Sequence, residues 1–92
     1  MLFVTEYRER ANITREHLKR LMGVFAEHPK APGEIAHYAR MDGSGGYVVL
    51  ESNDVEALYE SVLRFEEFFE FTITPVLHVE DAVGPILRSL ES

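Results

Sequence analysis

Hydrophobic residues fall into two kinds of pattern along this chain. In four stretches they alternate with polar residues or run together, with β-branched and aromatic side chains prominent, as is typical of β-strands. These stretches are residues 2–8 (LFVTEYR), 34–40 (EIAHYAR), 47–51 (YVVLE) and 68–79 (FFEFTITPVLHV). Pro75 interrupts the last one, so we expect that strand at an edge of the sheet, where a missing N–H is tolerated.

Between these strands, apolar residues recur every three or four positions, which predicts amphipathic helices. The first helix follows Thr14, a suitable N-cap, and ends at the prolines of PKAPG. The second has Asn53 as its N-cap and Glu56 at N3, close to a capping box. A short third helix occupies EDAVGPILRSLES at the C-terminal end, although the pattern does not fix where it starts.

The predicted order is β-α-β-β-α-β followed by a C-terminal helix, in one domain spanning residues 1–92. The glycines of MDGSGG supply the turn that joins the second and third strands into a hairpin. This is the ferredoxin-like α+β arrangement, an antiparallel sheet with both long helices on one face.

The strands are more hydrophobic than such a fold requires. A sheet covered on one face should show polar alternation on the other, yet residues 47–50 read YVVL and residues 2–4 read LFV. No further element of the chain is available to cover the second face. We therefore expect a homodimer in which two sheets pack face to face as a dimeric α+β barrel. The alternative is a monomer with some apolar residues at its strand ends.

Composition narrows the functional classes. The net charge of −7 argues against binding to nucleic acid or to anionic membranes. Cysteine is absent, which excludes disulfides and thiolate chemistry. No apolar run is long enough to span a membrane, and no signal stretch opens the chain, so a cytoplasmic location is expected.

Two segments, MDGSGGYVVLESNDVEAL and FEFTITPVL, resemble a small bacterial family known as domain of unknown function 3303. The resemblance covers nearly the whole chain and is weak across the first helix. It implies membership of the dimeric α/β-barrel superfamily, which includes cofactor-independent monooxygenases, cyclases, isomerases, haem-degrading enzymes and members without a proven reaction. The family often has tryptophans near the ends of the second strand and second helix. Here Tyr38 and Phe65 stand in those regions, and the chain has no tryptophan.

Two residues are the candidates for acid–base catalysis. Glu51 shares strand parity with Tyr47 and would have a raised pKa in an apolar pocket. His37 lies mid-strand and can shuttle protons near neutral pH. The simpler readings are a solvated strand-end glutamate and a structural histidine. Tyr7, Tyr38, Tyr47 and His78 are the further candidates for lining a ligand pocket, although most such aromatics belong to cores.

Metal and cofactor sites are not predicted. The histidines show neither the i, i+4 helical spacing nor the i, i+2 strand spacing of metal sites, and GSGG lacks the lysine and helix of a phosphate loop. The leading hypothesis is a cofactor-independent cyclase, isomerase or monooxygenase acting on a hydrophobic metabolite. The alternative is a non-catalytic dimeric module that binds a ligand or partner. Haem degradation is a weaker third option that would need His37 or His78 to bind iron.

Overall fold

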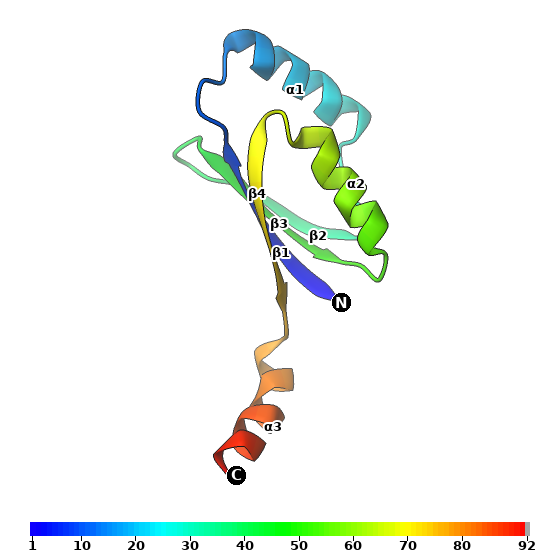
Figure 1. Cartoon of the computed structure of the whole chain (residues 1–92), viewed down its shortest axis with the longest axis vertical. Coiled ribbons are helices and arrows are strands. Elements are labelled where there is room, and N and C mark those ends of the chain that lie inside the picture. Colours follow the sequence, from blue (N-terminus) through cyan, green and yellow to red (C-terminus); the bar gives the residue numbers. More distant parts are fainter. Residues whose placement is uncertain (92) are drawn as a thin grey trace.

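The computed structural model describes residues 1–91 and has the predicted order of elements. They are β1 (Leu2–Glu9), α1 (Arg15–Glu27), β2 (Glu34–Ala39), β3 (Gly45–Glu51), α2 (Val55–Phe65), β4 (Phe69–Val76) and α3 (Val79–Leu90). The four strands form one antiparallel sheet in the order β2-β3-β1-β4, and α1 and α2 lie on the same face of it (Figure 1). This is the ferredoxin-like fold that the sequence predicts.

The local signals explain where the elements begin and bend. Thr14 caps α1 as predicted, with its hydroxyl accepting a hydrogen bond from the His17 amide. The N-cap of α2 is Asp54 rather than the predicted Asn53, because the Asp54 carboxylate accepts the Ala57 amide at 3.1 Å. Pro75 lies in β4, which is an edge strand, as predicted. The third helix, whose start the sequence pattern left open, begins at Val79, and position 92 lies outside the described residues.

The two faces of the sheet differ sharply. Toward the helices, Phe3, Leu50 and Leu58 form a small buried core, and Leu50 is only 1% exposed. Side chains alternate along a strand, so the neighbours of Phe3 and Leu50 point to the other face. No element of residues 1–91 covers that other face. The core is therefore one-sided within the chain.

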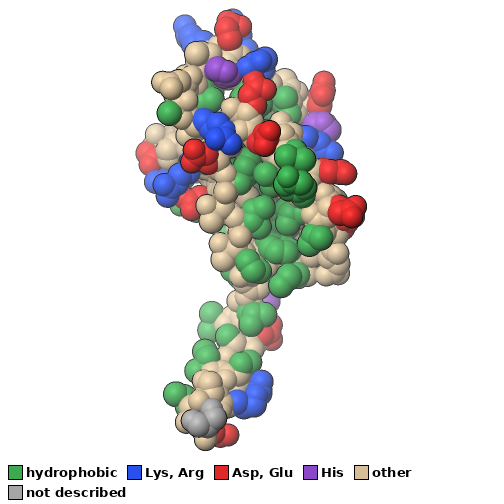
Figure 2. Space-filling model, viewed as in Figure 1, with side chains coloured by type: hydrophobic (Ala, Val, Ile, Leu, Met, Phe, Trp, Pro, Cys, Tyr) green, Lys and Arg blue, Asp and Glu red, His purple; other side chains and the backbone are tan. Residues whose placement is uncertain are grey.

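The last helix extends away from the body as an arm (Figure 1). The Cα radius of gyration is 16.2 Å, whereas a compact domain of this length has about 12 Å. The apolar residues of α3 lie on one side of the arm, at i, i+4, i+7, i+8 and i+11, with charged side chains opposite (Figure 2). They are Val79, Val83, Ile86, Leu87 and Leu90, and all five are exposed. Within the described chain this stripe has no surface to pack against.

Candidate functional site

A cavity of about 420 Å³ lies between the sheet and the two long helices. It occupies the place where a helix–sheet core would otherwise be, because α1 buries none of its residues. The lining is mostly apolar and comes from α1, α2 and all four strands. Its aliphatic and aromatic members include Leu21, Met22, Phe25, Ala31, Ala39, Val48, Leu50, Leu58, Val62, Phe65, Phe69 and Phe71. A volume of this size and a lining of this kind are typical of small-molecule sites.

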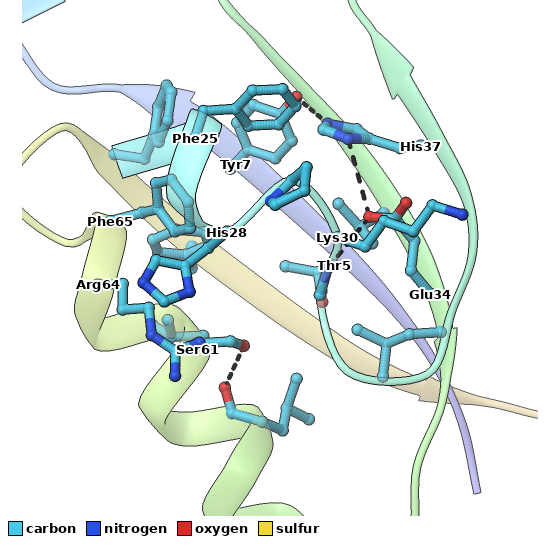
Figure 3. Close-up of a pocket in the computed structure, with 18 of the residues that line it drawn as sticks. Thr5, Tyr7, Phe25, His28, Lys30, Glu34, His37, Ser61, Arg64 and Phe65 are labelled. Atoms are coloured by element: carbon cyan, nitrogen blue, oxygen red, sulfur yellow. Dashed lines mark hydrogen bonds and ion pairs between the residues drawn. The ribbon is translucent and has the colours of Figure 1, made fainter. Parts of the chain in front are cut away.

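Three polar residues meet at one wall of the cavity (Figure 3). The Tyr7 hydroxyl on β1 lies 2.5 Å from Nε2 of His37 on β2. The other ring nitrogen of His37, Nδ1, lies 3.9 Å from a carboxylate oxygen of Glu34. A proton on Nδ1 is favoured by this negative charge, which leaves Nε2 free to accept the Tyr7 proton. The arrangement is a short chain of groups able to pass a proton.

An irregularity in β2 brings Glu34 and His37 together. Residues three apart in a regular strand point to opposite faces. Here the pairing with β3 shifts between Glu34 and Ala36, so that Glu34 pairs with Leu50 and His37 with Val48. The extra residue of this bulge turns Glu34 to the same face as His37, and both line the cavity. Strict alternation in the sequence gives no sign of this contact.

The Tyr7 ring reaches His37 because β3 has a glycine beneath it. Tyr7 pairs with Gly46, and a Cβ atom at Gly46 would collide with the Tyr7 hydroxyl and with the Tyr38 carbonyl. The edge of Phe69 packs against the Tyr7 ring, with centroids 4.8 Å apart. The ring is thus fixed by packing on one side and by the histidine on the other.

The environment of Tyr7 favours its protonated form. Burial raises the pKa of the Tyr7 hydroxyl, and the negative charge of Glu34 raises it further. At neutral pH, therefore, Tyr7 keeps its proton and can donate a hydrogen bond to Nε2 of His37. Nearby, the buried Thr5 hydroxyl has no hydrogen-bond partner among the described residues, although Thr5 lines the same cavity.

The other predicted site residues lie elsewhere. Tyr47 and Glu51 alternate with Val48 and Leu50 and so point to the uncovered face of the sheet. Tyr38 pairs with Tyr47 on that face and is 61% exposed. Only Tyr7 and His37 of the predicted residues line the cavity.

Glu51 does not occupy the apolar setting expected from the sequence. Its side chain is 55% exposed and forms an ion pair with the amino group of Met1. Together with His78, the exposed N-cap of α3, it lines a second cavity of about 440 Å³ at the end of the sheet where α3 begins. Tyr47 instead accepts a hydrogen bond from Arg40, whose guanidinium also pairs with Asp42.

Sequence reasoning missed several residues of the first cavity. They are His28, at the C-cap of α1, and Lys30 and Arg64. His28 and Arg64 lie at helix ends and Lys30 lies in the loop after α1, and at such positions the pattern carries no information about what lies opposite. Among the described residues, no three His, Asp or Glu side chains gather closely enough to hold a metal ion. In the same part of the chain, no helix has the length and hydrophobicity needed to cross a membrane.

Comparison with known proteins identifies the family. The family model described as Domain of unknown function (DUF3303) matches residues 1–89, so the chain belongs to this family. Comparison with curated proteins gave no match. A similar solved structure is that of 5-chloro-2-hydroxyhydroquinone dehydrochlorinase (TftG) from Burkholderia phenoliruptrix AC1100, in complex with 2,5-dihydroxybenzoquinone. It is 14% identical with a TM-score of 0.65, over 85% of this chain and 95% of that chain, which establishes a shared ferredoxin-like α+β fold.

Proposed function

We propose that this protein binds a small hydrophobic or aromatic metabolite in the cavity between sheet and helices, and isomerises or cyclises it by proton transfer. The observation that carries the proposal is the Tyr7–His37 hydrogen bond in the wall of an apolar cavity, with Glu34 beyond the histidine. Positioned acids and bases in an apolar site are the usual means of such catalysis. Glu34 takes the place of Glu51 in this proposal, because Glu51 lies outside the cavity.

The proposed chemistry is balanced over one cycle. A carbon or oxygen of the ligand gives a proton to the Tyr7 oxygen while the Tyr7 proton moves to Nε2 of His37, and the two transfers then run in reverse and return a proton to a different atom of the ligand. The Glu34 carboxylate stabilises the imidazolium that forms when His37 holds both protons. Isomerisation and cyclisation require only such transfers. We therefore favour them over the monooxygenase activity that the sequence also left open.

The structural comparison gives limited support. The similar structure is that of a dehydrochlorinase in complex with a cyclic quinone, 2,5-dihydroxybenzoquinone. At 14% identity this likeness extends to the fold and not to the reaction. It makes a cyclic organic ligand a reasonable first choice for experiments.

The test is cofactor-free turnover followed by ¹H NMR in deuterium oxide. The protein is incubated with a panel of lactones, hydroxyquinones and aromatic acids, and we expect at least one member to be isomerised, cyclised or deuterated. Tyr7→Phe and His37→Gln should each lower the rate at least tenfold, since proton-transfer groups contribute about 10²–10⁴-fold. Tyr38→Phe, on the opposite face of the sheet, is the matched control and should behave as wild type.

Two results would contradict the catalytic proposal. Equal rates in the wild type and in the Tyr7 and His37 variants would remove these residues from the chemistry. Saturable binding of panel members without conversion of any would favour the alternative, a non-catalytic module that binds ligands.

We also propose that the protein acts as a homodimer. The uncovered face of the sheet has an apolar half and a charged half. Near α3 it carries Leu2, Val4, Val49 and Val76, whereas farther along it carries charged residues such as Glu6 and Arg40. The apolar half adjoins the second cavity, whose lining includes Leu2, Val76 and Leu77, and α3 begins two residues beyond Leu77. Apolar side chains thus lie on the sheet, in the second cavity and on the arm, although Glu51, His78 and Asp81 also line that cavity.

The size of this surface suits an interface. The accessible surface is 6843 Å², against about 5,400 Å² for a compact monomer of this mass. The excess exceeds the roughly 800 Å² per partner that stable interfaces bury. A second copy related by twofold symmetry would present the same two surfaces, so each arm can lie across the partner's sheet.

A further inference from the structure

Thr5 is a polar residue at a position of the sheet where the fold itself calls for an apolar one. It lies on β1 between Phe3 and Tyr7, on the face that meets the helices, and pairs with Val48 of β3 and Ile73 of β4. Thr5 is 5% exposed, and within residues 1–91 it is the one buried residue that is polar. A valine would fill this place without burying a hydroxyl, so packing does not account for the threonine.

The Thr5 hydroxyl has no partner within the described chain. Its Oγ1 atom is closed to solvent and makes no hydrogen bond with any of residues 1–91. Buried hydroxyls normally have a partner, because a polar group that loses its water and gains nothing in return is destabilising. Ser61, another hydroxyl residue of the cavity lining, donates to the Leu58 carbonyl at 2.7 Å. Thr5 therefore keeps a hydrogen-bonding capacity that these residues do not use.

Thr5 belongs to the same wall of the cavity as Tyr7. Side chains two residues apart on a strand share a face, and both residues line the cavity (Figure 3). Rotation about the Cα–Cβ bond exchanges the methyl and hydroxyl groups of a threonine, so the hydroxyl can turn toward a polar atom that enters the cavity. Val48, the neighbour of Thr5 on β3, offers no polar side-chain atom. A ligand oxygen at this place would thus have Thr5 as its donor.

Proton transfer through Tyr7 gives such a donor a chemical role. When the Tyr7 oxygen takes a proton from a ligand carbon and passes its own proton to His37, the electron pair of the broken C–H bond stays on the ligand. In an enolisable carbonyl compound this pair moves to the carbonyl oxygen, and a fixed hydrogen-bond donor in an apolar site stabilises the charge there. Conjugation allows that oxygen to lie some way from the carbon that loses its proton.

We infer that the ligand of this cavity is a cyclic, enolisable carbonyl compound and that the Thr5 hydroxyl donates a hydrogen bond to its carbonyl oxygen. Return of the proton to a different carbon of the enolate completes an isomerisation without a co-reactant. A ligand without this oxygen would leave the hydroxyl unpaired, so Thr5 determines which ligands bind well. A flat ring suits the aromatic lining, which comprises Phe25, Phe65, Phe69 and Phe71. The inference rests on the proposed function, since it names the ligand class of the same cavity.

The experiment compares 2-tetralone with 2-methylenetetralin, two neutral bicyclic probes that differ only in the replacement of the carbonyl oxygen by a CH₂ group. Titrations followed by ¹H–¹⁵N correlation spectra give both the affinity and the location of binding. 2-Tetralone should bind at least fivefold more tightly and shift the amide signals of residues 4–7 and 47–49. Thr5→Val should remove this preference by weakening 2-tetralone binding about five- to tenfold, while binding of 2-methylenetetralin stays the same or improves.

Two further variants serve as controls. Thr5→Ser keeps the hydroxyl and should keep the preference for 2-tetralone. Thr72→Val makes the same chemical change on the opposite face of the sheet, where Thr72 pairs with Glu6 and does not line the cavity, and should leave both affinities unaltered. Equal affinities of the wild type for the two probes, a preference that persists in Thr5→Val, or binding of neither probe would overturn the inference.

The outcome is separable from that of the proposed function. Turnover that depends on Tyr7 and His37 but is indifferent to Thr5→Val, with no preference for 2-tetralone, would leave the proposed function standing and remove the carbonyl site. A preference for 2-tetralone that depends on Thr5, with no turnover of any substrate, would do the opposite.

Discussion

At the scale of single residues, the protein concentrates its polar chemistry in a few side chains of the cavity wall. Tyr7, His37 and Glu34 come from two strands that are not neighbours in the sheet, since β3 lies between them. Their contact depends on the absence of a side chain at Gly46 and on the bulge that turns Glu34 inward. Each member has an ordinary role alone, and only their meeting suggests proton transfer.

The titration of Tyr7 is a direct test of this environment. Because burial and Glu34 raise the pKa of Tyr7, the folded state favours its protonated form, and that contribution to stability is complete below the ordinary tyrosine pKa of about 10. It is lost as the pH rises through the higher pKa of the folded state. The absorbance component at 295 nm that Tyr7→Phe removes should therefore have its midpoint above pH 10. A midpoint at or below 10 would mean that Tyr7 is solvated.

At the scale of elements, each strand and helix serves the cavity differently. The strands supply its floor, and β3 contributes Leu50, the most buried side chain of the small core. α1 contributes apolar residues without burying any of them, so its stability comes from Thr14 capping and from its own hydrogen bonds more than from packing. α1 therefore borders the cavity without being anchored in the core.

Two glycine substitutions test separately how tightly β3 is packed and how exposed α1 is. Gly46→Ala in β3 forces its Cβ against the Tyr7 hydroxyl and the Tyr38 backbone, and we expect it to destabilise the protein by about 1–3 kcal/mol. Gly23→Ala in α1 meets no atom within 4 Å, and alanine is the better helix former, so it should stabilise the protein by about 0.5–1 kcal/mol. Urea unfolding followed by circular dichroism measures both. Similar effects of the two substitutions would show that Tyr7 does not lie over Gly46.

At the scale of the whole molecule, the proposed homodimer depends on the arm. A 12-residue helix with an exposed apolar stripe gains little by standing alone in water, because isolated helices of this length are marginal. Packing on a second copy would give the stripe and the apolar half of the sheet a common partner. The extended shape of the chain is then a property of one protomer and not of the assembled protein.

Sedimentation of arm variants tests this proposal. Ile86→Asp places a charge within the apolar stripe of α3 and should convert a dimer into a monomer at micromolar concentration, since an unpaired charge in an interface costs several kcal/mol. Arg88→Gln, on the side of the same helix opposite the stripe, is the control and should remain dimeric. A wild-type protein that sediments as a monomer would contradict the homodimer outright. A dimer that persists in Ile86→Asp would place the interface away from the arm.

The sequence by itself determined the order of elements, the ferredoxin-like arrangement and the position of β4 at an edge. These follow from hydrophobic period, caps and breakers, all of which act over a few residues. It also placed Tyr7 and His37 among the candidate residues, because polar groups within apolar strands stand out. The membership of the family was visible in the same strands, and the family model confirms it.

Only the tertiary structure decided which candidates meet. Strict alternation assigns Glu34 and His37 to opposite faces, and the bulge in β2 reverses this. The helices cover the face of β3 that carries Val48 and Leu50. Alternation along the strand therefore places Glu51 and Tyr47 on the other face, away from the cavity. Lys30 and Arg64 are distant in sequence and meet one cavity only because α1 and α2 lie on the same face of the sheet. Register and helix placement are long-range properties, so local pattern determined the fold and the three-dimensional packing determined the site.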